Sequence, residues 1–205
     1  MLISLKARVA YLAVPKTGST AIEAALAPHC DVVLSGHPQL KHMRLRRFER
    51  QVRPILPGGG EGIETVAMIR EPLDWLGSWY RYRTRPELSG PNSTAGIGFD
   101  QFVRDWLSDD PPRHARVGMQ SAMLAPPADG PGLAHLFVHE RPGPMIAFLQ
   151  ERFGVPIALD RRNVSPEMAL TLDPATEAAA RAAMAEDYAL HSRAMEAAGA
   201  GVACG

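Results

Sequence analysis

The chain has 205 residues, of which 46% are hydrophobic and 21% are charged, a composition typical of a globular protein. Its 22 lysines and arginines balance its 22 aspartates and glutamates, which argues against binding to nucleic acid or to an anionic membrane through net charge. No apolar stretch reaches the roughly 18 residues of a membrane-spanning helix, and the first residues lack the basic and apolar regions of a signal peptide. We therefore expect a cytoplasmic protein without a membrane span, folded as a single domain over residues 1–205.

The first half of the chain alternates apolar runs with polar loops. Residues 8–14 are a short run rich in β-forming residues that ends at Pro15, and they predict a buried strand. The other elements predicted in this half are strands over 31–34 and 64–70 and helices over 19–27, 42–52 and 73–84. The last of these helices begins after Pro72, a residue that suits the first turn of a helix.

The second half continues the alternation. Turn-forming stretches over 85–98 and 125–132 lie among an amphipathic helix over 99–107, a strand over 135–139 and a helix over 143–153. The alanine-rich tail over 174–198 predicts one long helix, supported by the i,i+4 pair of Glu177 and Arg181. Strands that alternate with helices predict an α/β fold with a parallel sheet flanked by helices on both faces.

The loop between the first predicted strand and helix has the residues of an anion site. The start of a helix offers unpaired N–H groups and the positive end of the helix dipole. Gly18 lets the backbone approach an anion, Ser19 and Thr20 add hydroxyl donors, and Lys16 adds a positive charge. On these local features alone, a solvated lysine followed by an ordinary helix cap is an equally good interpretation.

This loop is not the phosphate loop of an ATPase. That loop has the pattern GxxxxGK[ST], in which the lysine follows the second glycine. Here Lys16 precedes Gly18, and no glycine lies in the five positions before Lys16. A nucleotide or phosphosugar kinase would therefore need a variant loop, and no predicted strand ends in the acidic pair that such an enzyme needs for Mg²⁺.

The segment PKTGST resembles the 5′-phosphosulfate loop of the sulfotransferases that use 3′-phosphoadenosine 5′-phosphosulfate (PAPS), in their carbohydrate-modifying branch, sulfotransferase family 2. The resemblance implies a P-loop-like sheet and a lysine that contacts both the 5′-phosphate and the transferring sulfuryl group. It also implies loop amides and hydroxyls that hold the 5′-phosphate. The matching residues are Lys16, Thr17, Gly18, Ser19 and Thr20.

A second segment, AMIREPLDWLGSWYRYR, resembles the 3′-phosphate motif of the same family. In that motif an arginine ends a strand, a serine follows eight residues later on a helix, and both bind the 3′-phosphate. Arg70 and Ser78 have this spacing, and Pro72 stands where the family often has proline. A planar guanidinium also suits a phosphate group because it can donate two parallel hydrogen bonds. Weaker similarity extends to positions that recur in this branch, and the last two would contact the nucleotide: Gln120, Glu140, Asn163 and Ser165.

Sulfuryl transfer to a hydroxyl needs a group that accepts the hydroxyl proton, and histidine titrates near neutral pH. His42 matches the histidine that serves as the base in several carbohydrate sulfotransferases. His37 is the second candidate, and Glu23 is the third because some relatives use a carboxylate. The other five histidines have no motif around them, and we interpret them as structural: His29, His114, His135, His139 and His191. No spacing of histidines, cysteines or acids indicates a metal site.

The sequence therefore predicts an enzyme that transfers a sulfuryl group from PAPS to a hydroxyl of a carbohydrate or other small acceptor, and releases 3′-phosphoadenosine 5′-phosphate (PAP). Lys16 and His42 would be its catalytic residues. Arg44, Arg46 and Arg47 lie beside His42 and are equally consistent with binding an acidic sugar and with a solvated face. A kinase with a variant loop and a non-catalytic nucleotide-binding module are the alternatives.

Overall fold

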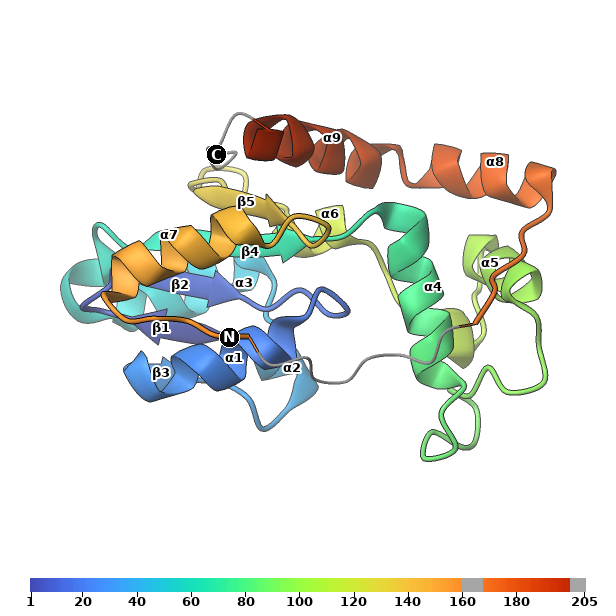
Figure 1. The fold of residues 1–205 in the computed structure, drawn as a ribbon, viewed down its shortest axis with the longest axis horizontal. Coiled ribbons are helices and arrows are strands. Elements are labelled where there is room, and N and C mark those ends of the chain that lie inside the picture. The colour runs from blue at the N-terminus through green and yellow to red at the C-terminus, as the bar shows by residue number, and fades with distance from the viewer. Residues whose placement is uncertain (160–167, 200–205) are drawn as a thin grey trace.

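The computed structural model describes residues 1–159 and 168–199. Its centre is a five-stranded sheet with the strand order β3-β1-β2-β4-β5 (Figure 1). The strands are β1 (Leu2–Ser4), β2 (Val9–Leu12), β3 (Val32–Val33), β4 (Glu64–Ile69) and β5 (His135–Val138). The strands predicted over 8–14, 31–34, 64–70 and 135–139 are therefore confirmed, and β1 is an additional strand.

The sheet is mixed, so the predicted parallel sheet is confirmed for β2, β4 and β5 and does not extend to β1. Strand β4 lies between β2 and β5 and is parallel to both, whereas β1 is antiparallel to both β2 and β3. Only β1 therefore runs in the opposite direction. The reason is local: four residues separate Ser4 from Val9, and so short a connection joins antiparallel neighbours only.

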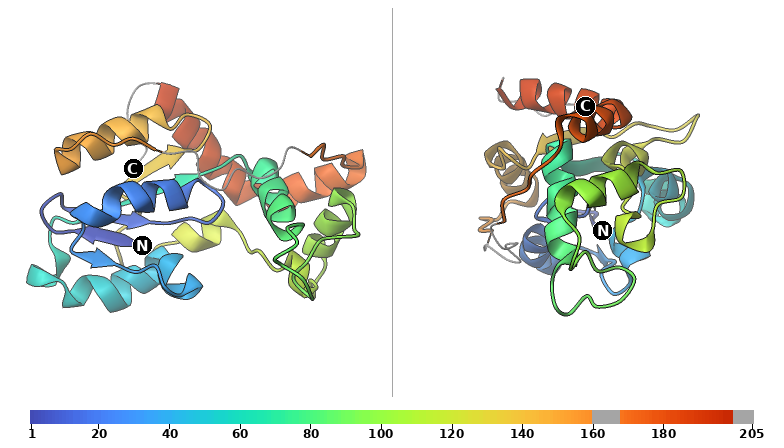
Figure 2. Two further views of the ribbon diagram at one scale, coloured as in Figure 1. Left: turned by 60° about the horizontal axis from the view of Figure 1, so that its bottom comes forward. Right: turned by 90° about the vertical axis from the view of Figure 1, so that its right-hand side faces the viewer.

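Helices cover both faces of the sheet, as predicted (Figures 1 and 2). The α-helices are α1 (Ser19–Leu26), α2 (Pro38–Lys41), α3 (Leu45–Arg47), α4 (Pro72–Arg83), α5 (Phe99–Leu107), α6 (Gln120–Leu124), α7 (Gly143–Phe153), α8 (Pro174–Ala183) and α9 (Ala185–Gly199). One core cluster packs α1 and α7 against one face, and a second packs α3, α6 and α9 against the other. Within the described ranges, no helix is long and apolar enough to cross a membrane.

A third apolar cluster lies beyond the carboxyl ends of β2 and β4. It joins α4, α5 and α8 through the buried rings of Trp75, Tyr80 and Phe102 and through Met184. The predicted long tail helix is divided at Met184, whose backbone leaves the helical conformation between α8 and α9 (φ −97°, ψ 21°). The helix predicted over 42–52 is instead α3 followed by a π-helical turn, Phe48–Val52.

Candidate functional site

The loop from β2 to α1 is held from several sides. The Thr17 side chain is fully buried, and its hydroxyl donates to the carbonyl of Val14 at 2.8 Å. The indole N–H of Trp75 donates to the carbonyl of Pro15 at 2.8 Å. Gly18 has φ +78° and begins α1 without a side-chain cap, so the first N–H groups of the helix are left for another acceptor. The loop is therefore a fixed backbone cradle, and Thr17 supports it from inside.

Four cations meet at this cradle. The guanidinium of Arg70 donates to the carbonyl of Lys16 at 3.3 Å. Burial, and after it the positive charges of Arg85, Arg70 and Arg81 in that order, together lower the pKa of Lys16 to about 8. Asp74 bridges two of the arginines, at 2.5 Å from Nε of Arg70 and 3.2 Å from Nη2 of Arg81. The cluster keeps a positive excess at the start of α1, which is the charge that an anionic ligand requires.

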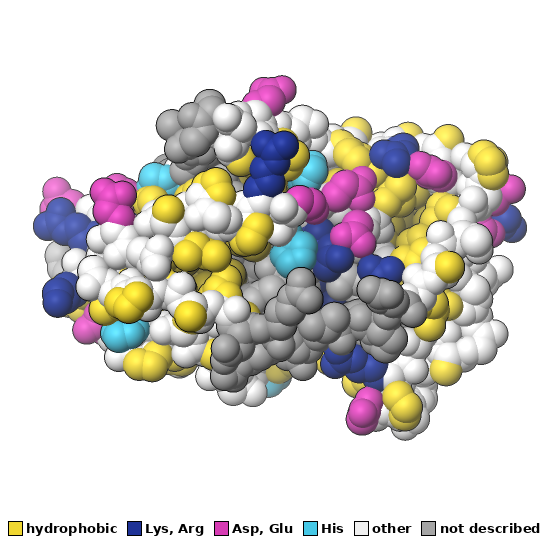
Figure 3. Space-filling model, viewed as in Figure 1, with side chains coloured by type: hydrophobic (Ala, Val, Ile, Leu, Met, Phe, Trp, Pro, Cys, Tyr) yellow, Lys and Arg dark blue, Asp and Glu magenta, His cyan; other side chains and the backbone are white. Residues whose placement is uncertain are grey.

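Charged side chains gather in the middle of the face shown in Figure 3, between the sheet and the helices of the third cluster. This is the carboxyl edge of β2, β4 and β5, where ligands bind in open α/β sheets. The hydrogen bond from the Arg70 guanidinium to the Lys16 carbonyl makes these two predicted site residues neighbours at this edge.

Gln120 fixes the backbone of Arg70. Its side-chain carbonyl accepts from the Arg70 N–H at 2.9 Å, and its amide donates to the Arg70 carbonyl at 2.8 Å. Gln120 is only 1% exposed. Asp187 of α9, also 1% exposed, accepts in turn from the N–H groups of Gln120 and Ser121 at 3.0 and 2.7 Å. The C-terminal helix therefore supports the residue that we expect to bind the 3′-phosphate.

Gln120→Leu is expected to lower the free energy of unfolding by about 1–3 kcal/mol, because it leaves the N–H and carbonyl of Arg70 without their buried partner. Urea denaturation followed by circular dichroism measures this loss. Gln101→Leu is the matched control, since Gln101 is exposed and its side chain bonds Asp105 at 2.7 Å; its cost should stay within about 0.5 kcal/mol. Equal costs for the two variants would contradict the support role of Gln120.

The other predicted phosphate ligands have fewer contacts with the residues of the cradle. Ser19 begins α1 and is 5% exposed, and Ser78 lies two turns into α4 and is 4% exposed. Thr20 accepts a hydrogen bond from Lys41 at 3.4 Å. Among the residues that the structure describes, no hydrogen bond joins Ser78 to Arg70 or to the loop over 16–20. Asn163 and Ser165 lie outside the described residues.

His42 lies beside the carboxyl end of β2. Its Nδ1 is 2.6 Å from the carbonyl oxygen of Ala13. A carbonyl only accepts, so Nδ1 carries the proton and Nε2 of the neutral ring is left as an acceptor. Burial lowers the pKa of His42, the hydrogen bond to Ala13 opposes this, and the charge of Lys41 adds to the lowering. The ring is therefore neutral at pH 7 and able to take a proton.

The three arginines that follow His42 are not among the causes of its lowered pKa. Burial and Lys41 account for it. Arg44, Arg46 and Arg47 are exposed, and Arg47 bonds Gln51 at 2.8 Å. They form a solvated face.

The two rival bases have other structural partners. His37 is exposed and caps α2, with its Nδ1 accepting from the N–H of Gln39 at 3.2 Å. Glu23 lies 2.7 Å from Nζ of Lys41 and 3.3 Å from the amino group of Met1. Both of these ion pairs engage the Glu23 carboxylate in the structure without ligand. The geometry therefore favours His42.

His139 is the residue at this site that sequence reasoning missed. It follows β5, and its ring lies 3.7 Å from the position that a Cβ on Gly18 would occupy. Burial and the charge of Arg70 lower its pKa, and a hydrogen bond to the backbone of Thr17 partly opposes them. The next residue, Glu140, accepts from the Glu71 N–H at 2.7 Å. The sequence could have indicated His139 by its position: it ends the apolar run HLFVH, and the strand formed by that run ends at the same sheet edge as β2 and β4.

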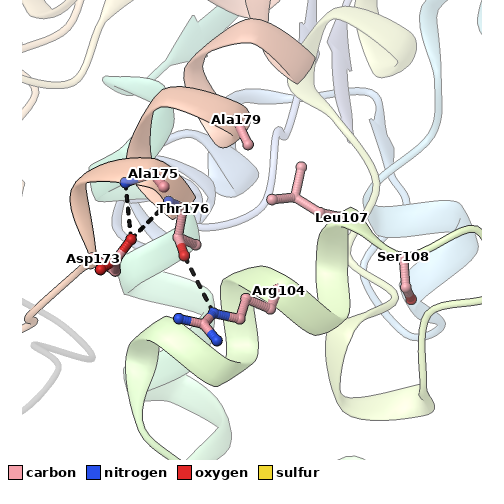
Figure 4. A pocket seen from close by; sticks show the side chains of 7 residues that line it. All are labelled: Arg104, Leu107, Ser108, Asp173, Ala175, Thr176 and Ala179. Carbon is pink, nitrogen blue, oxygen red and sulfur yellow. Dashed lines mark hydrogen bonds between the residues drawn. The ribbon is translucent and has the colours of Figure 1, made fainter.

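A hollow of about 380 Å³ lies outside this site, between α5 and α8 (Figure 4). The residues that line it are Arg104, Leu107, Ser108, Asp173, Ala175, Thr176 and Ala179. Its polar side chains bond local partners: Arg104 bonds Thr176 at 3.3 Å, and Asp173 caps α8. The hollow contains none of the predicted site residues.

Comparison with known proteins finds no matching family model, no matching curated protein and no matching solved structure.

Proposed function

We propose that the protein is a sulfotransferase that moves a sulfuryl group from PAPS to a hydroxyl of a carbohydrate or other small acceptor in the cytoplasm. One observation carries the proposal. Lys16 of the PKTGST loop and Arg70 at the end of β4 are in contact at one sheet edge, in the two sequence contexts that resemble the donor-binding motifs of that family. We interpret the β2–loop–α1 unit as P-loop-like on the same ground.

The donor would lie along the carboxyl edge of β2 and β4. The N–H groups at the start of α1 and the charge of Lys16 suit the 5′-phosphosulfate. Arg70, with its backbone fixed by Gln120, suits the 3′-phosphate, and Ser78 stands on the following helix. Asn163 and Ser165 complete this proposed nucleotide site on the strength of the sequence alone.

The proposed reaction is an in-line displacement at sulfur. The acceptor oxygen forms a bond to sulfur while the bond between sulfur and the 5′-phosphate oxygen breaks, and PAP leaves with that electron pair. Nε2 of His42 takes the proton of the acceptor hydroxyl, because Nδ1 is committed to Ala13. Lys16 and the start of α1 stabilise the negative charge that grows on the leaving phosphate.

PAP is expected to raise the free energy of unfolding by about 3 kcal/mol at 100 times its dissociation constant, by mass action. ATP at the same concentration should stabilise the protein far less, because it lacks a 3′-phosphate for Arg70. Thermal unfolding with PAP, ATP and buffer makes the comparison. Equal shifts would contradict a PAPS site and favour a kinase, and binding of PAP without turnover of PAPS on any glycan or alcohol would favour a non-catalytic module.

A further inference from the structure

Lys16 differs from the other lysines of the chain. The sequence contains only three: Lys6, Lys16 and Lys41. Lys6 is exposed, and Lys41 is 2.7 Å from the carboxylate of Glu23. Within residues 1–159 and 168–199, no carboxylate forms an ion pair with Lys16. A lysine that is partly buried without a carboxylate partner is unusual, so its surroundings need a separate explanation.

Aromatic rings and positively charged arginines surround the Lys16 amine. Its Nζ lies 4.0 Å from the ring centroid of Tyr82 and 5.8 Å from that of Trp79. The nearby charges are Arg70 at the end of β4, Arg81 on α4, and Arg85 after α4. The carboxylate of Asp74 is bound to Arg70 and Arg81.

The rings of Tyr82 and Trp79 attract the ammonium form of Lys16 through cation–π contacts, whereas burial and the neighbouring arginines oppose this attraction and favour the neutral amine. Removal from water and neighbouring positive charges both disfavour an ammonium ion, in agreement with the lowered pKa of Lys16 of about 8. At pH 7.5 roughly a quarter of such a group is unprotonated, against about 0.1% of a lysine with an ordinary pKa. A neutral lysine amine beside other cations is an activated nucleophile.

We propose that Lys16 is a site of acylation by acyl phosphates. The cations around the amine and the uncapped start of α1 attract the phosphate end of such a molecule. The neutral nitrogen attacks the acyl carbonyl carbon, the bond from that carbon to the phosphate oxygen breaks, and inorganic phosphate leaves with the electron pair. The amine proton passes to water, and the product is an uncharged amide.

Acylation would switch the anion site off. It removes the one positive charge that projects from the loop itself, and it places an acyl group where the phosphate would lie. Acyl phosphates are products of phosphoryl transfer to carboxylic acids, so the modification would couple this site to the supply of activated acyl groups. This regulation adds to the proposed transfer reaction but does not depend on it, because it needs only the anion site and the amine.

The test treats the unmodified protein with acetyl phosphate at pH 7.5 and follows acetylation of the three lysines over time by peptide mass spectrometry. Nucleophilicity falls together with pKa, so the net advantage is smaller than the ratio of neutral fractions. We expect Lys16 to react about tenfold faster than Lys6, with Lys41 slowest because Glu23, at 2.7 Å, engages its amine in an ion pair. A Lys16 rate equal to or below that of Lys6 overturns the proposal.

Two controls separate its parts. The N-hydroxysuccinimide ester of acetic acid carries no phosphate, so the preference for Lys16 over Lys6 should shrink with this reagent; an unchanged preference would overturn the role of the anion site. Arg81→Gln should slow acetylation of Lys16 severalfold, whereas Arg104→Gln, which removes a distant i,i+4 pair with Asp100, should not.

Protection by PAP distinguishes this proposal from the proposed function. Fast acetylation of Lys16 that PAP does not prevent would contradict the proposed donor site and leave the acylation site intact.

Discussion

His42→Ala is expected to lower the rate of sulfuryl transfer by about 10²–10⁴-fold, the usual contribution of a positioned general base. The affinity for PAP should stay nearly unchanged, because the base contacts the acceptor and not the donor. The structural reason is the orientation of the ring: Ala13 holds Nδ1 at 2.6 Å, which leaves Nε2 toward an acceptor. Turnover of labelled PAPS on an identified acceptor, together with calorimetry of PAP binding, measures both quantities.

The pH dependence gives the same hypothesis a second test. A base works only when unprotonated, so the rate should rise with pH and reach its plateau once His42 is neutral. Burial lowers the pKa of His42 below the ordinary 6.5, so the midpoint of the rise should lie below 6.5. His37→Ala is the matched control and should cost little, since that ring only caps α2. A near-normal rate for His42→Ala, or a larger loss for Glu23→Gln, would move the role to another residue.

Arg70→Ala is expected to weaken PAP binding by about 2–4 kcal/mol, or about 30- to 1,000-fold, as for the loss of one partner of a buried charge pair. The affinity for ADP, which lacks the 3′-phosphate, should change much less. In the structure without ligand the guanidinium is held by Asp74 at 2.5 Å and by the carbonyl of Lys16 at 3.3 Å, so it is already placed beside the loop. Calorimetry with both nucleotides separates a lost phosphate contact from general damage.

Arg104→Ala is the matched control for that experiment. Arg104 also forms an i,i+4 pair, with Asp100 at 2.8 Å, but it lies between α5 and α8, and its loss should leave PAP affinity unchanged. Lys16→Ala should differ from both, with a slower transfer step as its main effect, because its charge meets the leaving phosphate. If Arg70→Ala binds PAP as tightly as the unmodified protein, the assignment of the 3′-phosphate site is wrong.

The sequence was most informative where local pattern and tertiary context agree. The run at 8–14, the helix at 99–107 and the strand at 135–139 were predicted within two residues of their ends, because each combines a clear apolar period with a turn signal. The meeting of Lys16 and Arg70 was also predictable, since both follow strands that run in the same direction. Their proximity depends only on the order and direction of the strands, which the alternation of strands and helices in the sequence indicates.

The rest depends on contacts that no local pattern encodes. Strand β1 has three residues and exists because β2 and β3 bond its two edges. The tail pattern is helical throughout and does not indicate the interruption at Met184, whose side chain is buried in the third cluster. The proton position on His42 follows from the carbonyl of Ala13, and the place of His139 follows from the register of β5 on β4.

The support of Arg70 by Gln120 and Asp187 has a consequence for synthesis of the protein. The cradle and Arg70 precede residue 71, whereas the carboxylate that fixes Gln120 is that of Asp187 on α9. A ribosome adds about 5–20 residues per second. The β2–α1 loop is therefore synthesised many seconds before α9, which carries the supporting carboxylate. During that interval Arg70 lacks the support of α9, and the complete anion site forms only after α9 has been synthesised.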